Sequence, residues 1–136
     1  MRQTDRGSVS VVVVTLTFAL MMLAGLVHDG GRVIAARREA DAVANAAARA
    51  GVQGMDETAL RTGGGVSLDR ADVARRVERY LATSGFDGDA VVDGELVIVR
   101  VHRSEPLAVL SALGLTSTTV EGSGQARAVR AIKEGA

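Results

Sequence analysis

Two histidines and several carboxylates are the side chains of this sequence that could support acid–base or metal chemistry. His28 stands next to Asp29, a pair that could form a proton relay or half of a metal site. Adjacent residues of a helix point in different directions, so an interfacial polar cap is the favoured interpretation of this pair. His102 falls at the end of a predicted strand near two arginines, and we expect it to be an exposed strand residue.

The remaining polar patterns indicate no catalytic or metal chemistry. Asp87, Asp89 and Asp93 are spaced loosely like calcium ligands, but the Gly and distal Glu of a calcium loop are missing, so we expect a solvated turn. The glycines at 63–65 lack the Lys-Ser/Thr that grips phosphate. Ser104 beside Glu105 has no placed histidine to complete a nucleophile triad. We therefore predict no catalytic residue, no cofactor site and no metal site, and a protein that is not an enzyme.

Composition excludes further classes of function. The 136 residues carry 16 basic and 16 acidic side chains, so no net field would steer the chain to nucleic acid. Cysteine is absent, which removes disulfides and thiolate zinc sites. Aromatic residues make up 2% of the chain, too few to line a small-molecule pocket or a base-stacking platform. We expect neither a nucleic-acid partner nor a small-molecule substrate.

A long apolar helix is the main structural element that the sequence predicts, and the other parts of the chain are attached to it. Residues 7–27 contain no charge, and at about 1.5 Å per residue they are long enough to cross the roughly 30 Å core of a bilayer. The sequence predicts a short flank at 1–6, a transmembrane helix at 7–27 and an alanine-rich helical extension at 28–52. His28, Asp29 and Arg32 would cap the helix where it leaves the membrane. The charges on the two sides of the span do not decide its orientation.

Alanine recurs at three- and four-residue spacing along the extension. Such spacing forms a smooth helix face that a second helix could approach closely. A bias of overall composition explains the alanines equally well, and both interpretations stay open. The face consists of Ala36, Ala40, Ala44 and Ala47.

Residues 53–136 read as a small α+β head. A joining segment at 53–66 precedes an amphipathic helix at about 69–84, whose apolar stripe includes Tyr80 and which Ser67 or Asp69 could cap. A hairpin turning at Asp93-Gly94, a short helix ending at Gly114 and a long strand at 117–128 follow. The strand has one face of small residues that would admit a close-packed helix. The expected head is αββαβ with a three-stranded antiparallel sheet.

The chain resembles the TadE/TadG-like proteins of the tight-adherence (Flp) pilus system. The resemblance rests on the segment DRGSVSVVVVTLTFALMMLAGLVHDGGRVIAARREADAVANAAARAG, on the late hairpin, and on PLAVLSALGL followed by TSTTVEGSGQARA. It implies a single-pass, pilin-like membrane component with a cytoplasmic N-terminus, an extracytoplasmic head and other pilus-assembly proteins as partners. The matching positions are Arg6, Gly7, Asp29, Gly31, Arg32, Arg37, Arg38 and residues 44–50.

One departure from the pilins of this system concerns processing. Cleavage between Gly7 and Ser8 would correspond to prepilin maturation, but Val12 stands where those pilins carry Glu. A processed pseudopilin and a permanently anchored accessory protein therefore both stay open. The leading hypothesis is a non-enzymatic pilus assembly or secretion component that acts by helix packing. The alternative is a membrane-tethered binding or sensor domain that uses the 86–105 hairpin surface.

Overall fold

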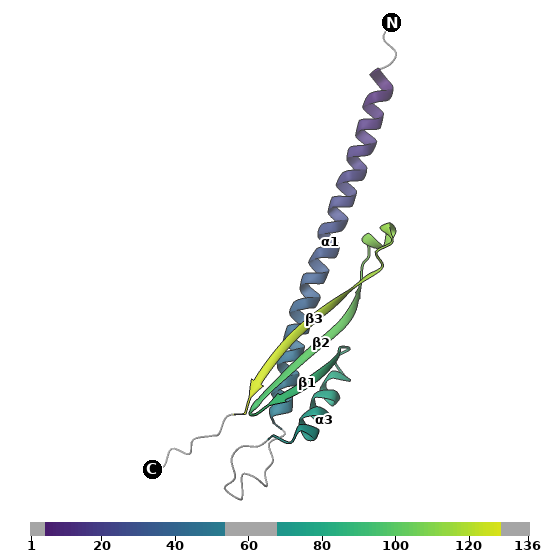
Figure 1. Cartoon of the computed structure of the whole chain (residues 1–136). Helices are drawn as coiled ribbons and strands as arrows, with labels where there is room; N and C mark the ends of the chain where they lie inside the picture. The colour runs from purple at the N-terminus through teal and green to yellow at the C-terminus, as the bar shows by residue number, and fades with distance from the viewer. Residues whose placement is uncertain (1–4, 54–67, 129–136) are drawn as a thin grey trace, which may run out of the picture. The chain divides into compact units, whose positions relative to one another are not determined.

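The computed structural model describes residues 5–53 and 68–128. Within these ranges the order is a long helix, a second helix, two strands, a short 3-10 helix and a third strand (Figure 1). The bounds are α1 Asp5–Val52, α3 Arg70–Leu81, β1 Asp87–Asp93, β2 Leu96–Pro106, η1 Leu110–Leu113 and β3 Ser117–Arg127. The α+β class and the three-stranded sheet confirm the predicted fold.

Helix α1 contains the apolar run as one continuous stretch of 48 residues. It is long and apolar enough to cross a membrane, with a mean hydropathy of 2.4 in its candidate span. The large side chains of the run are exposed around the helix, as a lipid-facing segment requires and as a buried core helix does not. They include Val9, Val11, Val12, Val13, Val14, Leu16, Phe18, Leu20, Met21, Leu23, Leu26 and Val27.

The sheet has the strand order β1-β2-β3. Strands β1 and β2 are antiparallel and join through the turn Gly94-Glu95, with Asp93 paired to Leu96. Gly94 has a φ of +59°, a conformation that glycine adopts without steric cost. The hairpin is confirmed, although its turn lies one residue later than Asp93-Gly94.

The three aspartates expected in a solvated turn lie in strand β1 instead. Asp89 is opposite Arg100 and Asp87 is opposite His102 in the register of β1 and β2. Opposite charges on directly paired strand positions, such as Asp89 and Arg100, stabilise a sheet, which offsets the weak strand propensity of aspartate. The prediction of a turn was wrong because it weighed residue type without the cross-strand partners.

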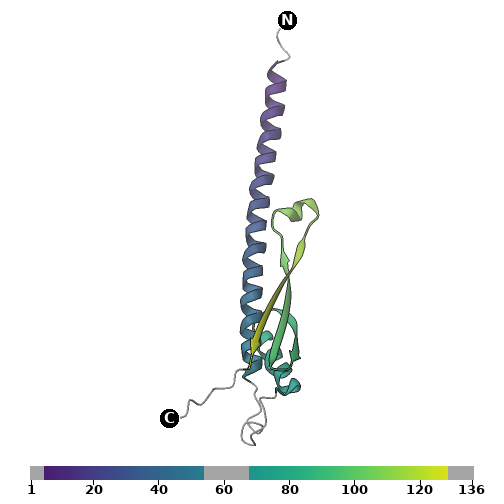
Figure 2. The ribbon, with the colours of Figure 1, turned by 60° about the vertical axis from the view of Figure 1, so that its left-hand side comes forward.

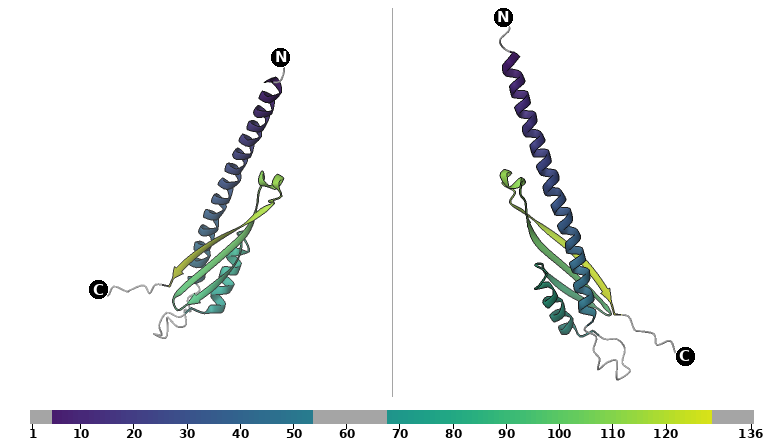
Figure 3. Two further views of the ribbon diagram at one scale, coloured as in Figure 1. Left: turned by 45° about the horizontal axis from the view of Figure 1, so that its top comes forward. Right: turned by 180° about the vertical axis from the view of Figure 1, so that it is seen from behind.

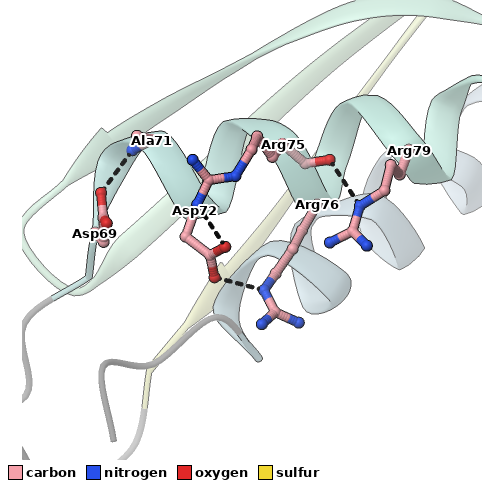
Figure 4. A network of polar contacts seen from close by, with 6 residues as sticks. All are labelled: Asp69, Ala71, Asp72, Arg75, Arg76 and Arg79. Carbon is pink, nitrogen blue, oxygen red and sulfur yellow. Dashed lines mark hydrogen bonds and ion pairs between the residues drawn. The ribbon is translucent and has the colours of Figure 1, made fainter. Parts of the chain in front are cut away.

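Helix α3 begins at a side-chain cap and buries one stripe. The Asp69 carboxylate accepts a hydrogen bond from the Ala71 amide at 2.8 Å, as predicted for a capping residue (Figure 4). Val73, Val77 and Leu81 are buried on the helix face toward the sheet. Tyr80 is 37% exposed and lies off this stripe, so its assignment to the apolar face was wrong. Ser67 lies outside the described residues.

The exposed face of α3 carries a chain of arginine contacts. Asp72 accepts from Arg76 Nε at 2.7 Å and from Arg75 Nη2 at 3.0 Å (Figure 4). The hydrogen bond from Arg76, followed by that from Arg75, holds the pKa of the Asp72 carboxyl below its ordinary value. Arg79 Nε donates to the Arg75 carbonyl at 3.3 Å. These contacts organise the side chains of an otherwise basic helix face.

Contacts divide the chain into two compact units. The first unit joins Met1–Ile34 to Glu105–Thr118, and the second joins Ala35–Ser104 to Thr119–Ala136. In the second unit, α3 and the alanine-rich part of α1 lie on the same face of the sheet, which the rear view in Figure 3 shows. The core of this unit contains Ala40, Ala44, Ala47, Ala48, Val73, Val77, Leu81, Phe86, Val97, Val99, Val101 and Val120.

Candidate functional site

The first unit is organised around Asp29. This carboxylate is 1% exposed and accepts hydrogen bonds from three successive backbone amides: Ala108 at 3.1 Å, Val109 at 2.9 Å and Leu110 at 2.8 Å. The three amides belong to the β2–β3 loop, residues 107–116, which lies beside α1 (Figure 2). Proline at 106 ends β2, and the amides that enter η1 have no strand or helix partner of their own. The Asp29 carboxylate supplies that partner and clamps the loop to the helix.

The clamp is electrostatic as well as geometric. The amide of Leu110 contributes most to holding the pKa of the Asp29 carboxyl below its ordinary value of 3.8. Burial raises this pKa and so opposes the shift, while the amides of Ala108 and Val109 and the neighbouring His28 lower it further. The carboxyl is therefore charged at neutral pH, and each hydrogen bond that it accepts from a loop amide is charge-assisted.

Two further contacts fasten the same loop. A Cβ atom added at Gly25 would lie 2.8 Å from the Cβ of Val109, so only glycine allows the valine to seat on α1 at this position. Arg32 donates to Glu105 at 3.0 Å, one helical turn beyond Asp29. The loop is closed at its base by a hydrogen bond from the Leu107 amide to the Thr116 carbonyl at 3.0 Å.

The polar residues expected to cap the membrane exit thus have three different surroundings. His28 is exposed, Asp29 is buried beneath the loop and Arg32 is paired with Glu105. The loop amides that bind Asp29 are 79 to 81 residues away in sequence, and no local pattern could have identified them. Gly7 and Ser8 fall within the helical range of α1.

In the second unit, the alanine face is buried against the chain's own sheet. Ala40 and Ala44 are fully buried, and Gly122 and Gly124 of β3 pack directly on the helix backbone beside them. A Cβ atom at Gly122 would lie 2.6 Å from the Asp41 nitrogen. The small strand face thus admits a close-packed helix, as predicted. All four alanines of the predicted face, Ala36, Ala40, Ala44 and Ala47, are buried within the chain, and β3 covers two of them, Ala40 and Ala44. Packing of this face against a helix of another protein stays a prediction.

Polar contacts border this packed interface. The Ser123 amide donates to Asp41 at 3.1 Å. Arg103 donates to Glu39 at 2.9 Å, and its guanidinium stacks 4.2 Å from the ring centre of Phe86. These contacts hold the sheet along the helix. Arg103 and Glu39 lie at the surface of the second unit.

A surface depression of about 460 Å³ lies beside the interface. Its walls mix basic and acidic side chains, and His102 lies among them as an exposed strand residue. A wall of alternating charge suits solvent or a polar protein surface better than an apolar ligand. Within residues 9–53 and 68–128, His, Asp and Glu side chains form no cluster that could hold a metal ion. The charged lining residues are Arg37, Asp41, Asp89, Arg100 and Glu121.

A family model matches the N-terminal part of the chain. No curated protein and no solved structure matches the chain significantly. The match covers almost all of α1, including the apolar run, Asp29 and the alanine face. Residues 7–54 match the family of putative Flp pilus-assembly TadE/G-like proteins, which confirms the resemblance over this part of the chain.

Proposed function

We propose that the protein is a membrane-anchored component of a Flp (Tad) pilus assembly or secretion system. The observation that carries this proposal is the coincidence of the family match at 7–54 with a helix that exposes its large apolar side chains. In the proposed arrangement, residues 7–27 span the membrane, 1–6 are cytoplasmic, 28–52 extend the helix and 53–136 form an extracytoplasmic head.

Physical chemistry supports the membrane location of this helix. Exposure of twelve large apolar side chains between Val9 and Val27 of α1 would be strongly unfavourable in water, at about 25 cal/mol for each Å² of apolar surface. The cost disappears in hydrocarbon, where a helix satisfies all of its own backbone hydrogen bonds. In the proposed role the chain acts through contacts with other membrane proteins and not through catalysis.

The structure suggests which surface of α1 is available to partners. Because β3 already covers Ala40 and Ala44, contacts with other subunits would use the exposed apolar part of the helix. Helices associate in bilayers through close van der Waals packing, since lipid and leucine are equally apolar. Partner contacts would then form inside the membrane.

Val12 supports an anchored accessory role over a filament subunit. Its side chain is exposed on the apolar helix and cannot form the ion pair with a neighbouring N-terminus that a glutamate would form. Intact-mass measurement of the protein from its own membranes tests this choice. We expect residues 1–7 to be retained; a chain beginning at Ser8 would instead favour a processed pseudopilin.

Co-purification tests the proposed function itself. The full chain, tagged at its C-terminus and extracted from membranes in mild detergent, should recover proteins of a Flp pilus-assembly system. A double variant, Val13→Arg with Leu20→Arg, should lose them, whereas Ala35→Arg with Ala42→Arg, at the same spacing on exposed positions of the same helix, should retain them. Recovery of the chain as a monomer that binds a small ligand would favour the membrane-tethered binding domain and overturn the proposal.

A further inference from the structure

We propose that the β2–β3 loop is a second membrane contact, an apolar loop that Asp29 holds in the interfacial layer of the bilayer beside α1. This inference rests on the proposed membrane span of α1. It adds a lipid-binding surface, formed by a segment remote in sequence, to a protein whose helix alone would otherwise contact the membrane.

The composition of the loop suits a lipid surface. No charged residue occurs between Glu105 and Glu121, and the loop itself carries five large apolar residues. Leu113 and Leu115 are 56% and 58% exposed. Two exposed leucines on one loop are unfavourable in water and favourable at the acyl boundary.

The clamp places the loop at the end of the apolar run. Val109 is seated over Gly25, two residues before the end of the uncharged segment 7–27, and the Asp29 carboxylate holds the loop two residues beyond that end. At about 1.5 Å per residue, these two attachments are only about 6 Å apart along the helix axis. Both belong to the same compact unit, so their relation does not depend on the rest of the head. The loop therefore lies at the level where α1 leaves the hydrocarbon.

Most backbone amides of the loop have hydrogen-bond acceptors within the protein, as an environment with little water demands. Unpaired amides are costly in a bilayer, and here side-chain and backbone acceptors bind seven of the loop amides. Asp29 accepts three amides, and carbonyls within the loop accept others. Paired amides are those of Leu107, Ala108, Val109, Leu110, Ala112, Gly114 and Leu115. Asp29 is in turn covered by the loop, which shields its charge from lipid.

The charged pair nearest to the clamp lies on the side away from the apolar run. Arg32 and Glu105 pair one turn beyond Asp29, where the helix is expected to be in the aqueous layer. Along α1 in the other direction, Leu26, Val27 and Leu23 are exposed, so this unit carries exposed apolar side chains on the helix as well as on the loop. The presence of both in one unit, beside the proposed span, is the reason to assign the loop to the bilayer and not to a protein groove.

Single-cysteine labelling tests the inference, because the chain has no cysteine of its own. Spin labels are placed at Leu113→Cys and at two references: Phe18→Cys within the span, and Val91→Cys, an exposed apolar position of β1. The full chain is reconstituted sparsely into phosphatidylcholine–phosphatidylglycerol vesicles, and collisions with oxygen and with a water-soluble nickel chelate are measured. We expect the nickel accessibility of the Leu113 label to be severalfold lower than that of the Val91 label.

The references separate two kinds of failure. A Phe18 label that is open to nickel would show that α1 does not span the bilayer and would overturn the proposed anchoring. A Phe18 label in lipid with a Leu113 label as open to nickel as that at Val91 would overturn the loop inference alone. Protection of Leu113 that arises only in native membranes, where other proteins are present, would also overturn it and identify a protein partner.

Asp29→Asn combined with Leu113→Cys tests the clamp. The amide side chain keeps the size of the carboxylate but loses its charge and one acceptor oxygen, so the loop amides lose partners. We expect the Leu113 label to become several times more accessible to nickel and more mobile, while Asp41→Asn, which removes the carboxylate that binds Ser123, leaves it unchanged. An unchanged Leu113 label in Asp29→Asn would show that Asp29 does not position the loop.

Discussion

The two halves of α1 use apolar residues in opposite ways. From Val9 to Val27 most of the apolar side chains are large and exposed. From Ala36 to Ala48 they are small, and those on one stripe are fully or almost fully buried. One half of the helix thus exposes large side chains to its surroundings, and the other half carries small side chains that allow a strand to pack closely on it.

The difference reflects the kind of neighbour each half has. Lipid is fluid and conforms to any side chain, so size and direction matter little and only the absence of charge is required. A strand is rigid, and its backbone can approach a helix backbone only where both carry small residues. Ala40 opposite Gly122 and Ala44 opposite Gly124 satisfy that condition.

The largest expected difference between the two halves of α1 is in how well the membrane retains the chain when two arginines are placed in one half or the other. Val13→Arg with Leu20→Arg places two cations in the proposed span, each costing about 2.5 to 3.5 kcal/mol of insertion free energy. Ala35→Arg with Ala42→Arg should cost almost nothing, since both alanines are exposed. Carbonate extraction of membranes checks the prediction: the first variant should be released and the second retained. Equal release of both variants would contradict the proposal that only the N-terminal half of α1 lies in the membrane.

A larger side chain on β3 should disrupt the alanine half. In Gly124→Val even the Cβ atom would lie 2.5 Å from the Asn45 Cα, so the strand must move off the helix. We expect a loss of about 3 kcal/mol in the free energy of unfolding, the upper part of the range for overpacked cores. Thermal unfolding in detergent, followed by circular dichroism, measures it. Gln125→Val, an exposed neighbour on the same strand, should change stability little, and equal effects in both variants would contradict the packing.

Acid should release the β2–β3 loop and leave the alanine half intact. The pKa of Asp29 is lower in the folded chain than its ordinary value of 3.8, so its stabilising effect is complete above that value. The effect is lost as the pH falls from there through the folded pKa. We expect the mobility of a Leu113→Cys label to rise only below about pH 4. Asp29→Asn should abolish this titration, and a midpoint above neutrality would assign the release to another group.

Removal of a surface ion pair should have the smallest effect. Glu39→Gln breaks the bond to Arg103 while Arg103 keeps its stacking on Phe86. Exposed pairs of this kind contribute about 0.2 to 1 kcal/mol, so the melting temperature should fall only slightly. Glu78→Gln on the exposed face of α3 serves as the reference. A loss as large as that of Gly124→Val would mean that charge, and not close packing, holds the sheet on the helix.

Local patterns predicted most of the secondary structure. The Asp69 cap, the hairpin at Gly94, the stop at Gly114 and the alternation of β3 follow from preferences that act over a few residues. Where the expected structure depended on a partner, prediction failed. Asp87 and Asp89 of β1 were assigned to a turn because His102 and Arg100, their cross-strand partners, were not yet placed.

The sequence by itself determined where the apolar helix lies, which face of its extension is smooth and which strand is small-faced. Each of these is a periodicity, and periodicity reveals a face but not the surface that covers it. Only the tertiary structure decided that β3 occupies the alanine face and that Asp29 binds the Ala108, Val109 and Leu110 amides. Those contacts join residues some 80 positions apart, and their energies depend on distances that no local pattern encodes.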